Sequence, residues 1–215
     1  MDFISISLLF LTILFAIGFI VMLILYFTIR CNNTNGEMNN TNADEQMNLL
    51  WRDHVSLTRM FLMDSLLHNN KAALDETTKQ LLQNQDKLGA NYARIYGNKQ
   101  LGNEYAKLLK EHILIAAEIV QNAKNNKPND EAIKKWYKNK DELVQFISTY
   151  NKNIDPQILN KHYTDHLDLT TQELLHMLKG NYPASFDYYN RALASALQMS
   201  QYIGSKSYNN NYSEN

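Results

Sequence analysis

The sequence predicts an all-α protein, with an N-terminal transmembrane helix followed by an antiparallel helical bundle of four long helices plus shorter ones. A charge-free apolar stretch covers residues 3–29. Along most of the remaining chain, apolar side chains recur at alternating spacings of three and four, the period of one face of an α-helix. The 215 residues include only 7 glycines and 3 prolines, and no segment alternates as strands do, which disfavours a strand-and-turn fold.

The apolar stretch of residues 3–29 is predicted to be an uncleaved membrane anchor. A helix of this length spans about 40 Å, more than the ~30 Å of bilayer hydrocarbon. A cleaved signal peptide, the alternative, would have a basic amino-terminal region and a small-residue cleavage site, and the sequence has neither. Arg30 directly follows the stretch and favours a cytoplasmic C-terminal side. We therefore expect a single-pass membrane protein, with residues 1–30 in the lipid bilayer and a cytoplasmic bundle.

The rest of the chain is predicted to divide into a tether, one domain and a tail. Residues 31–44 are rich in Asn and lack apolar periodicity, which indicates a flexible tether. Residues 45–204 are long enough for one domain with its own core. Residues 205–215 are predicted to be a disordered tail. The 27 asparagines are typical of an AT-rich genome, such as that of a low-GC microbe or a large DNA virus. For a virus, the expected location is the virion or host membrane.

The first three predicted helices of the domain cover residues 45–68, 71–92 and 99–124. The first ends at Asn69-Asn70. The second is expected to break near Gly89 and to be closed by Gly97, because glycine weakens a helix interior and favours the position just past a helix end. The third has the most regular stripe of helical spacing, which consists of Leu101, Tyr105, Leu108, His112, Ile115 and Ile119.

The last three predicted helices cover residues 130–150, 155–180 and 183–204. Asp130 is a good capping residue for a shorter helix. Asp155 followed by Pro156 is a strong start signal, since a capping carboxylate precedes a proline at the first helical position. Gly180 and Gly204 are expected to end the last two helices. Short loops between amphipathic helices predict antiparallel neighbours.

Histidines occupy apolar-stripe positions on three of the predicted helices. The candidates are His54, His112, His162 and His166. His162 and His166 are four residues apart, so both imidazoles share one helix face, a spacing that can clamp a metal ion. One hypothesis is a metal site in the bundle interior with His54 or His112 as third ligand, and with zinc, iron, manganese or copper as the ion. The expected carboxylate partners are Asp64, Glu111 and Glu173.

The alternative is that these histidines are hydrogen-bonded core groups without a metal. The 13 tyrosines and many asparagines supply partners, and polar core residues can fix helix register. The di-iron signature needs two Glu-x-x-His pairs plus further carboxylates, and only Glu173 to His176 has that form. Both interpretations are compatible with the sequence.

Composition and missing motifs exclude several functions. The 21 basic and 22 acidic side chains give a net charge of −1, which disfavours nucleic-acid binding. One cysteine cannot form an internal disulfide, and there is no Gly-rich phosphate loop or Gly-x-Ser-x-Gly motif. Two functions remain. The first is a membrane-anchored structural or interaction module, with a protein partner or self-association and no catalysis. The alternative is a membrane-tethered metal-binding four-helix bundle, either a sensor or a metal-dependent enzyme.

Several sequence blocks resemble small all-helical proteins of spore-forming bacteria, a family without an established activity. The blocks are Leu50-Trp51-x-x-His54-x-x-x-Thr58-Arg59-Met60, Tyr96-Gly97-Asn98, Leu108-Leu109-x-Glu111-His112-x-x-Ile115-Ala116, Trp136-Tyr137-x-Asn139-x-Asp141 and His166-Leu167-x-Leu169-Thr170. They span most of residues 49–205. The resemblance implies a helical bundle and supplies no catalytic residues. The anchor and the tether are additions to that pattern.

Overall fold

The computed structural model of the chain describes residue 22, residues 43–68 and residues 70–207. Residues 43–66 are helical, and we refer to them as the 43–66 helix. Five further helices follow: α2 (Lys71–Tyr96), α3 (Lys99–Lys124), α4 (Asp130–Tyr150), α5 (Pro156–Leu178) and α6 (Tyr182–Ser207). No strand occurs in the described ranges, so the all-α prediction is confirmed. The bundle there has six long helices, instead of four long helices plus shorter ones.

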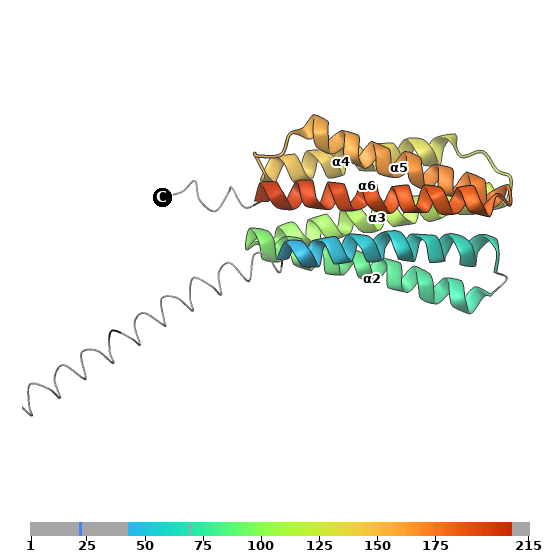
Figure 1. The fold of residues 1–215 in the computed structure, drawn as a ribbon, viewed down its shortest axis with the longest axis horizontal. Coiled ribbons are helices and arrows are strands. Elements are labelled where there is room, and N and C mark those ends of the chain that lie inside the picture. The colour runs from blue at the N-terminus through green and yellow to red at the C-terminus, as the bar shows by residue number, and fades with distance from the viewer. Residues whose placement is uncertain (1–21, 23–42, 69, 208–215) are drawn as a thin grey trace, which may run out of the picture. The chain divides into compact units, whose positions relative to one another are not determined.

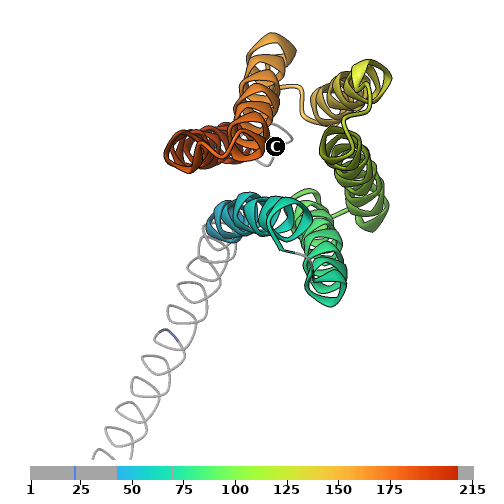
Figure 2. The same cartoon turned by 90° about the vertical axis from the view of Figure 1, so that its right-hand side faces the viewer.

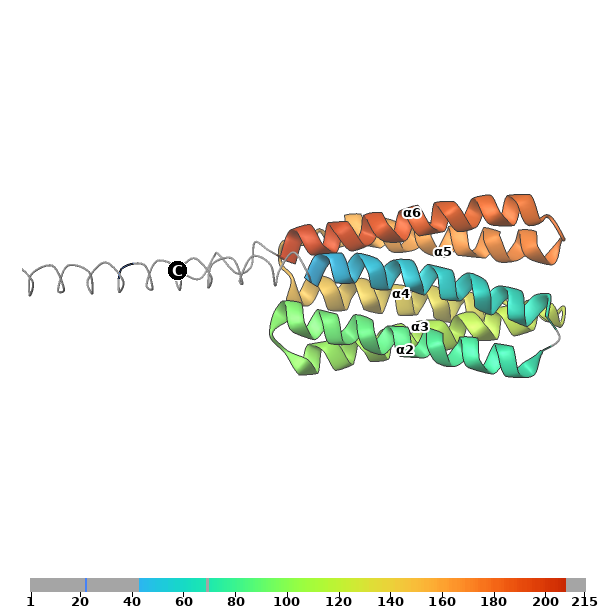
Figure 3. The same cartoon turned by 60° about the horizontal axis from the view of Figure 1, so that its bottom comes forward.

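Successive helices run in opposite directions along the bundle and are joined by short loops (Figure 1, Figure 3). Viewed along the bundle, the six helices follow one another around a ring, and α6 returns to the side of the 43–66 helix (Figure 2). Because directions alternate, the 43–66 helix, α3 and α5 run parallel to one another. This parallel relation places residues of equal helical register from three helices at one level of the bundle.

Local capping signals explain where several helices begin and end. The Asp155 side chain accepts a hydrogen bond from the backbone N–H of Gln157 at 2.8 Å, with proline at the first turn of α5. Asn98 caps α3 by accepting from the N–H groups of Gln100 and Leu101. Gly97 ends α2 with a φ of 60°, a left-handed conformation that glycine adopts without a steric penalty. The predicted start at Asp155-Pro156 and the predicted closure by Gly97 are thus confirmed, although α2 extends to Tyr96 and the predicted helix covered only residues 71–92.

Two glycines that were expected to interrupt or end helices do neither. α2 continues through Gly89 to Tyr96, because Gly89 lies against the backbone of Gly102 in α3, and this contact needs a residue without a side chain. α6 continues through Gly204 to Ser207, where the predicted tail had begun. In both cases a contact with another helix outweighs the weak intrinsic helix preference of glycine.

The core consists of two hydrophobic clusters, one toward each end of the bundle. The first cluster includes Trp51, Tyr92, Tyr105, Leu143, Tyr163 and Met199. The second cluster includes Phe61, Leu81, Ile113, Trp136, Leu167 and Leu174. Every long helix except α6 contributes buried residues to both clusters. The level between the clusters is polar, and it is there that the candidate site lies.

The prediction of a single-pass membrane protein is corrected. Within the described ranges, no helix is both long enough and apolar enough to cross a bilayer. The predicted anchor, residues 3–29, and the predicted tether up to residue 42 lie outside those ranges. The structure therefore gives no support for the bilayer as a partner or for a location in a cellular, virion or host membrane.

Candidate functional site

Three of the predicted metal ligands meet in the bundle interior. His54, His112 and His166 lie on the three parallel helices, and their exposed fractions are 3%, 5% and 5%. The ring centroids of His54 and His166 are 5.8 Å apart. Burial lowers the pKa of His54 first, and charge repulsion from His166 and then His112 adds to the shift, so His112 lies near enough to act on the same ring. We refer to these three side chains as the imidazole layer.

Two amides from the intervening helices fix the rings of the imidazole layer. The Nδ1 of His112 lies 2.9 Å from the Oδ1 of Asn139, so this nitrogen donates to the amide oxygen. The Nδ1 of His54 lies 3.2 Å from the Nε2 of Gln85 and accepts from it. The Nδ1 of His166 is buried and has no hydrogen-bond partner among the described residues. Five helices thus contribute one polar side chain each to the level between the two clusters.

Burial lowers the pKa of each imidazole, because the charged form loses its hydration. The pKa of His112 falls to about 3 and that of His166 to about 4, mainly through burial. The pKa of His54 falls well below its ordinary value, first through burial and then through repulsion from the other two rings. All three imidazoles are therefore neutral at physiological pH, and the imidazole layer carries no charge.

The structure does not assemble the predicted metal site. His162 is half-buried and its ring lies 5.5 Å from that of Tyr202 in α6, while the next residue, Tyr163, takes the interior position. No group of three or more His, Cys, Asp or Glu side chains in the described part of the chain is placed to hold a metal ion. A site for zinc, iron, manganese or copper is therefore not supported. The four-residue spacing of His162 and His166 indicated a shared face, but only His166 faces the interior.

The predicted carboxylate partners are engaged elsewhere or lie nearer the surface. Asp64 accepts a hydrogen bond from Thr77 at 2.5 Å, which lowers the pKa of that carboxyl. Glu173 forms an ion pair with Arg59 at 2.8 Å. Burial raises the pKa of Glu173 to about 7, although the guanidinium of Arg59 opposes the shift. Glu111 is half-buried on α3.

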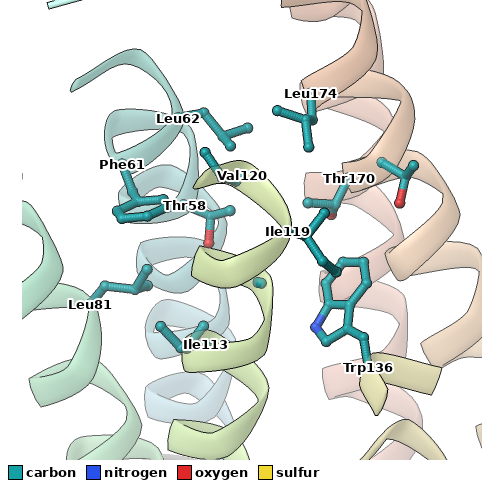
Figure 4. A pocket seen from close by; sticks show the side chains of 12 residues that line it. Thr58, Phe61, Leu62, Leu81, Ile113, Ile119, Val120, Trp136, Thr170 and Leu174 are labelled. Atoms are coloured by element: carbon teal, nitrogen blue, oxygen red, sulfur yellow. The ribbon is translucent and has the colours of Figure 1, made fainter. Parts of the chain in front are cut away.

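An apolar cavity of about 40 Å³ lies beside the imidazole layer, within the second cluster (Figure 4). Side chains from the 43–66 helix, α2, α3, α4 and α5 line it. Its apolar walls include Phe61, Leu62, Leu81, Ile113, Ile119 and Leu174. No charged side chain of the described residues lines this cavity.

The cavity is one helical turn from the imidazole layer. Thr58, Ala116 and Thr170 each follow one of the three histidines by four residues, and all three line the cavity. Because their helices are parallel, the next turn lies in the same direction on each helix. The neutral imidazoles therefore lie one turn beyond one end of a mainly apolar space and do not themselves line it.

Trp136 lines the cavity, and its indole nitrogen is enclosed by the surrounding protein. Its indole Nε1 is buried and has no hydrogen-bond partner among the described residues, and the side chain is 5% exposed. Figure 4 shows the nitrogen edge of the indole on the side of Ile113. The hydroxyls of Thr58 and Thr170 each donate to the carbonyl four residues earlier, at 2.8 Å.

No family model, curated protein or solved structure matches this chain. The resemblance to helical proteins of spore-forming bacteria stays a prediction. The structure brings together residues from four of the blocks that carry it, because His54, His112, Trp136 and His166 lie at or next to the same level of the bundle.

Sequence reasoning missed Trp136, Asn139 and Gln85 as parts of the site. Trp136 and Asn139 are three residues apart on one face of α4, so an inward Trp predicts an inward Asn. Gln85 follows Leu81 by four residues on α2 in the same way. Helical spacing thus indicates buried amides, but it does not indicate which histidines they contact.

Proposed function

We propose that this protein is a ligand-binding helical bundle that holds a small, largely apolar, uncharged molecule in the cavity beside the imidazole layer. The observation that carries the proposal is the cavity itself, a partly open space of about 40 Å³ between five helices. Protein interiors contain few voids larger than a water molecule. Ligand pockets are mostly apolar with a few placed polar groups, and this cavity has that composition.

Water is a poor occupant of this space. The volume of about 40 Å³ admits about three water molecules at roughly 10–15 Å³ each. Each buried water forms about three hydrogen bonds, whereas the polar groups of these walls are a few threonine hydroxyl oxygens that can act as acceptors. Hydration would leave most of those bonds unmade. An apolar molecule of similar size needs none of them and gains dispersion contacts with the walls.

The surroundings of the cavity disfavour a charged ligand. The adjacent imidazoles are neutral, and the nearest ionic groups, Arg59 and Glu173, are paired with each other. Moving an ion from water into such a space without a partner is strongly unfavourable. The ligand is therefore uncharged.

The test is xenon binding to the full chain, followed by xenon-129 NMR and by the methyl resonances of Ile113 and Leu174. We expect saturable binding, with shifts confined to residues that line the cavity. Ala116→Leu fills the space and abolishes binding, and Val120→Ile, which adds one methylene group, weakens it. Ala90→Leu is the matched control, because Ala90 is exposed on α2 and the change adds the same atoms away from the cavity.

Two outcomes contradict the proposed function. One is the absence of saturable binding in the unaltered chain. The other is equal binding in the unaltered chain and in an Ala116→Leu variant whose far-ultraviolet circular dichroism shows an intact helical fold. If Ala116→Leu does not fold, Val120→Ile decides in its place, since one added methylene group at the wall still reduces the volume.

A further inference from the structure

We infer that Trp136 sets the upper limit to the size of the molecule that this cavity accepts. This inference rests on the proposed ligand-binding function and names the size class of the ligand. The cavity of about 40 Å³ corresponds to about three water-sized groups, so the ligand has a similar number of heavy atoms. Dissolved apolar gases and short hydrocarbons such as propane belong to this class. Trp136 is the largest side chain that lines the space.

Two helical hairpins of the bundle share the same interhelical hydrogen bond. In the hairpin of the 43–66 helix and α2, the amide nitrogen of Asn84 donates to the carbonyl of Leu50 at 3.0 Å. In the hairpin of α3 and α4, the amide nitrogen of Asn139 donates to the carbonyl of Leu108 at 3.1 Å. Leu50 and Leu108 each lie four residues before a histidine of the imidazole layer. The two hairpins are therefore packed in the same register.

This shared register makes Leu81 and Trp136 equivalent positions. Each of them precedes the asparagine of its own helix by three residues, each is buried, and each lines the cavity. The first hairpin thus shows that a leucine packs at this position without disturbing the helices. The indole in the second hairpin occupies more of the space between the helices than a leucine would, and we infer that it keeps the cavity small.

The indole forms a firm part of the wall. Its nitrogen is enclosed by protein, so it is the ring carbons that can face the cavity. Figure 4 shows the six-membered ring of the indole on the side of Ile119. The indole centroid lies 5.0 Å from that of His112, whose Nδ1 is held by Asn139 at 2.9 Å. Because these neighbours fix the indole, the wall does not yield to a larger ligand.

The experiment gives α4 the residue that α2 carries at the equivalent position. Trp136→Leu removes a ring area close to that of benzene, and apolar cavities left by such substitutions stay dry and bind benzene. We expect the unaltered full chain to bind xenon and propane saturably, but not benzene. Trp136→Leu should raise the affinity for benzene by about tenfold or more, the least that an apolar pocket discriminates by size. The methyl resonances of Ile113 and Leu174 report binding.

Competition distinguishes an enlarged cavity from a separate new one. In Trp136→Leu, benzene should displace xenon, because both occupy one connected space. Trp51→Leu is the matched control, since it makes the same change in the first cluster, at a residue that does not line the cavity. It should leave xenon binding unchanged, and benzene that binds there should not displace xenon.

If Trp136→Leu does not fold, Trp136→Phe decides in its place. This smaller change should raise the affinity ratio of cyclopentane to propane, and an unchanged ratio would overturn the inference.

The outcomes separate this inference from the proposed function. The size limit is overturned if benzene binds the unaltered chain as tightly as it binds Trp136→Leu, or if it binds this variant without displacing xenon. A folded Trp136→Leu variant that does not bind benzene overturns it as well. Each of these results leaves the cavity as a ligand site. Absence of saturable xenon and propane binding in the unaltered chain overturns the proposed function itself.

Discussion

Each of the three buried imidazoles is neutral for the same physical reason, and His54 and His112 are each oriented by an amide side chain of a neighbouring helix. Burial removes the hydration of the charged ring, and repulsion within the layer adds to this effect for His54 and His112. The edge of Trp51 lies near two of the rings, with centroids 5.1 Å from His54 and 6.3 Å from His166. A neutral imidazole has one donor and one acceptor, so it can pair with an amide oxygen or an amide nitrogen. This versatility allows histidine to occupy a layer between two apolar clusters.

Acid is predicted to destabilise the protein through these histidines. Their pKa is lower in the folded chain than in the unfolded chain, so the unfolded chain binds more protons below about pH 6.5. Their stabilising contribution is complete above that pH and is lost as the pH falls toward the folded pKa, by up to about 1.4 kcal/mol per pH unit for each ring. Urea unfolding at about pH 7.5, 6.5 and 5.5 measures this slope.

Replacing one ring isolates its part of the pH dependence. His112→Gln should reduce the slope of the unfolding free energy against pH by the equivalent of nearly one proton taken up on unfolding. The reason is that the pKa of His112 is lowered to about 3 in the folded chain. His68→Gln, at an exposed position, is the control. An unchanged slope in His112→Gln would show that this ring is not buried as a neutral group.

The ion pair of Arg59 and Glu173 changes the stability of the fold with pH in the direction opposite to that of the histidines. The pKa of Glu173 is raised to about 7, so the folded chain retains a proton there that the unfolded chain releases above about pH 4.5. Its contribution to stability is therefore complete below about pH 4.5 and is lost as the pH rises through about 7. The guanidinium of Arg59 limits this loss, and it packs 5.0 Å from the ring centres of Phe186 and Tyr189.

Removing only one partner of this pair should lower the free energy of unfolding more than removing both partners does. Arg59→Met leaves Glu173, which is 1% exposed, without its cation and should destabilise the fold by roughly 3 kcal/mol at about pH 8. Arg59→Met combined with Glu173→Met should lose less unfolding free energy, because no buried charge remains unpaired. A double-mutant cycle from urea unfolding measures the coupling. Additive effects of the two substitutions would contradict this account.

The positions of the site residues were only partly predictable from the sequence. Helical spacing correctly indicated that His54, His112 and His166 face inward, because periodicity is a property of one helix. Which rings meet depends on the direction and register of three helices, which no local signal specifies. His162 shows this limit, since it lies four residues from His166 but at the edge of the buried face, beside Tyr202.

The contact between α2 and α3 is the closest approach of two helices that glycine makes possible here. A Cβ atom on Gly89 would lie 2.4 Å from the carbonyl oxygen of Gly102 and 2.6 Å from the Cβ of Ala106. A Cβ atom on Gly102 would lie 2.4 Å from the carbonyl oxygen of Gly89 and 2.5 Å from the Cβ of Ala93. Neither backbone oxygen can move without the whole helix, so both positions require glycine.

Gly89→Ala is therefore predicted to destabilise the protein, although alanine is the better helix former. Overpacking of this kind costs about 1–3 kcal/mol, which exceeds the gain of about 1 kcal/mol in helix propensity. Gly97→Ala is the comparison, because a Cβ atom there meets nothing within 4 Å and the only penalty is a φ of +60°. The urea midpoints of the two variants measure both effects on stability. Gly89→Ala should also weaken the burial of Tyr92, one turn away, and an increase in stability would contradict the close contact.

The helix boundaries were largely predictable, whereas the continuity of α2 was not. Asp155-Pro156 and Gly97 act within one turn of the chain, so their effect can be read from neighbouring residues. Gly89 has the same weak intrinsic preference for helix wherever it lies, and it stays helical because α3 presents Gly102 to it. The expected break at Gly89 accounts for one of the two long helices that the prediction missed, and α4, which was predicted as a shorter helix, is the other. The prediction of a protein partner or of self-association stays a prediction.

The bundle as a whole is expected to unfold as one cooperative unit. Its two clusters lie toward opposite ends, but the 43–66 helix, α2, α3, α4 and α5 each contribute to both. Helices of 21 to 26 residues, such as α2 to α5, run through both clusters and the imidazole layer. Loss of one cluster would leave half of every such helix without its buried face, and an isolated helix of about 12 residues is marginal in water.

The two tryptophans report on the two clusters separately, because Trp51 belongs to the first and Trp136 to the second. In Trp136→Phe the fluorescence follows Trp51, and in Trp51→Phe it follows Trp136. Within each variant, the urea midpoint by fluorescence should equal the midpoint by far-ultraviolet circular dichroism, as two-state unfolding requires. Non-coincident transitions would show that the clusters unfold independently and that the imidazole layer does not couple them.

The same cooperativity makes ligand binding visible far from the cavity. A molecule that binds only the folded chain stabilises it by RT ln(1 + [L]/Kd), whatever the position of the probe. Xenon at about 100 times its Kd should therefore add about 2.7 kcal/mol to the unfolding free energy reported by Trp51, which does not line the cavity. Ala116→Leu should remove this gain while Ala90→Leu retains it. A gain seen at Trp136 but absent at Trp51 would mean that the second cluster closes around its ligand as a separate unit.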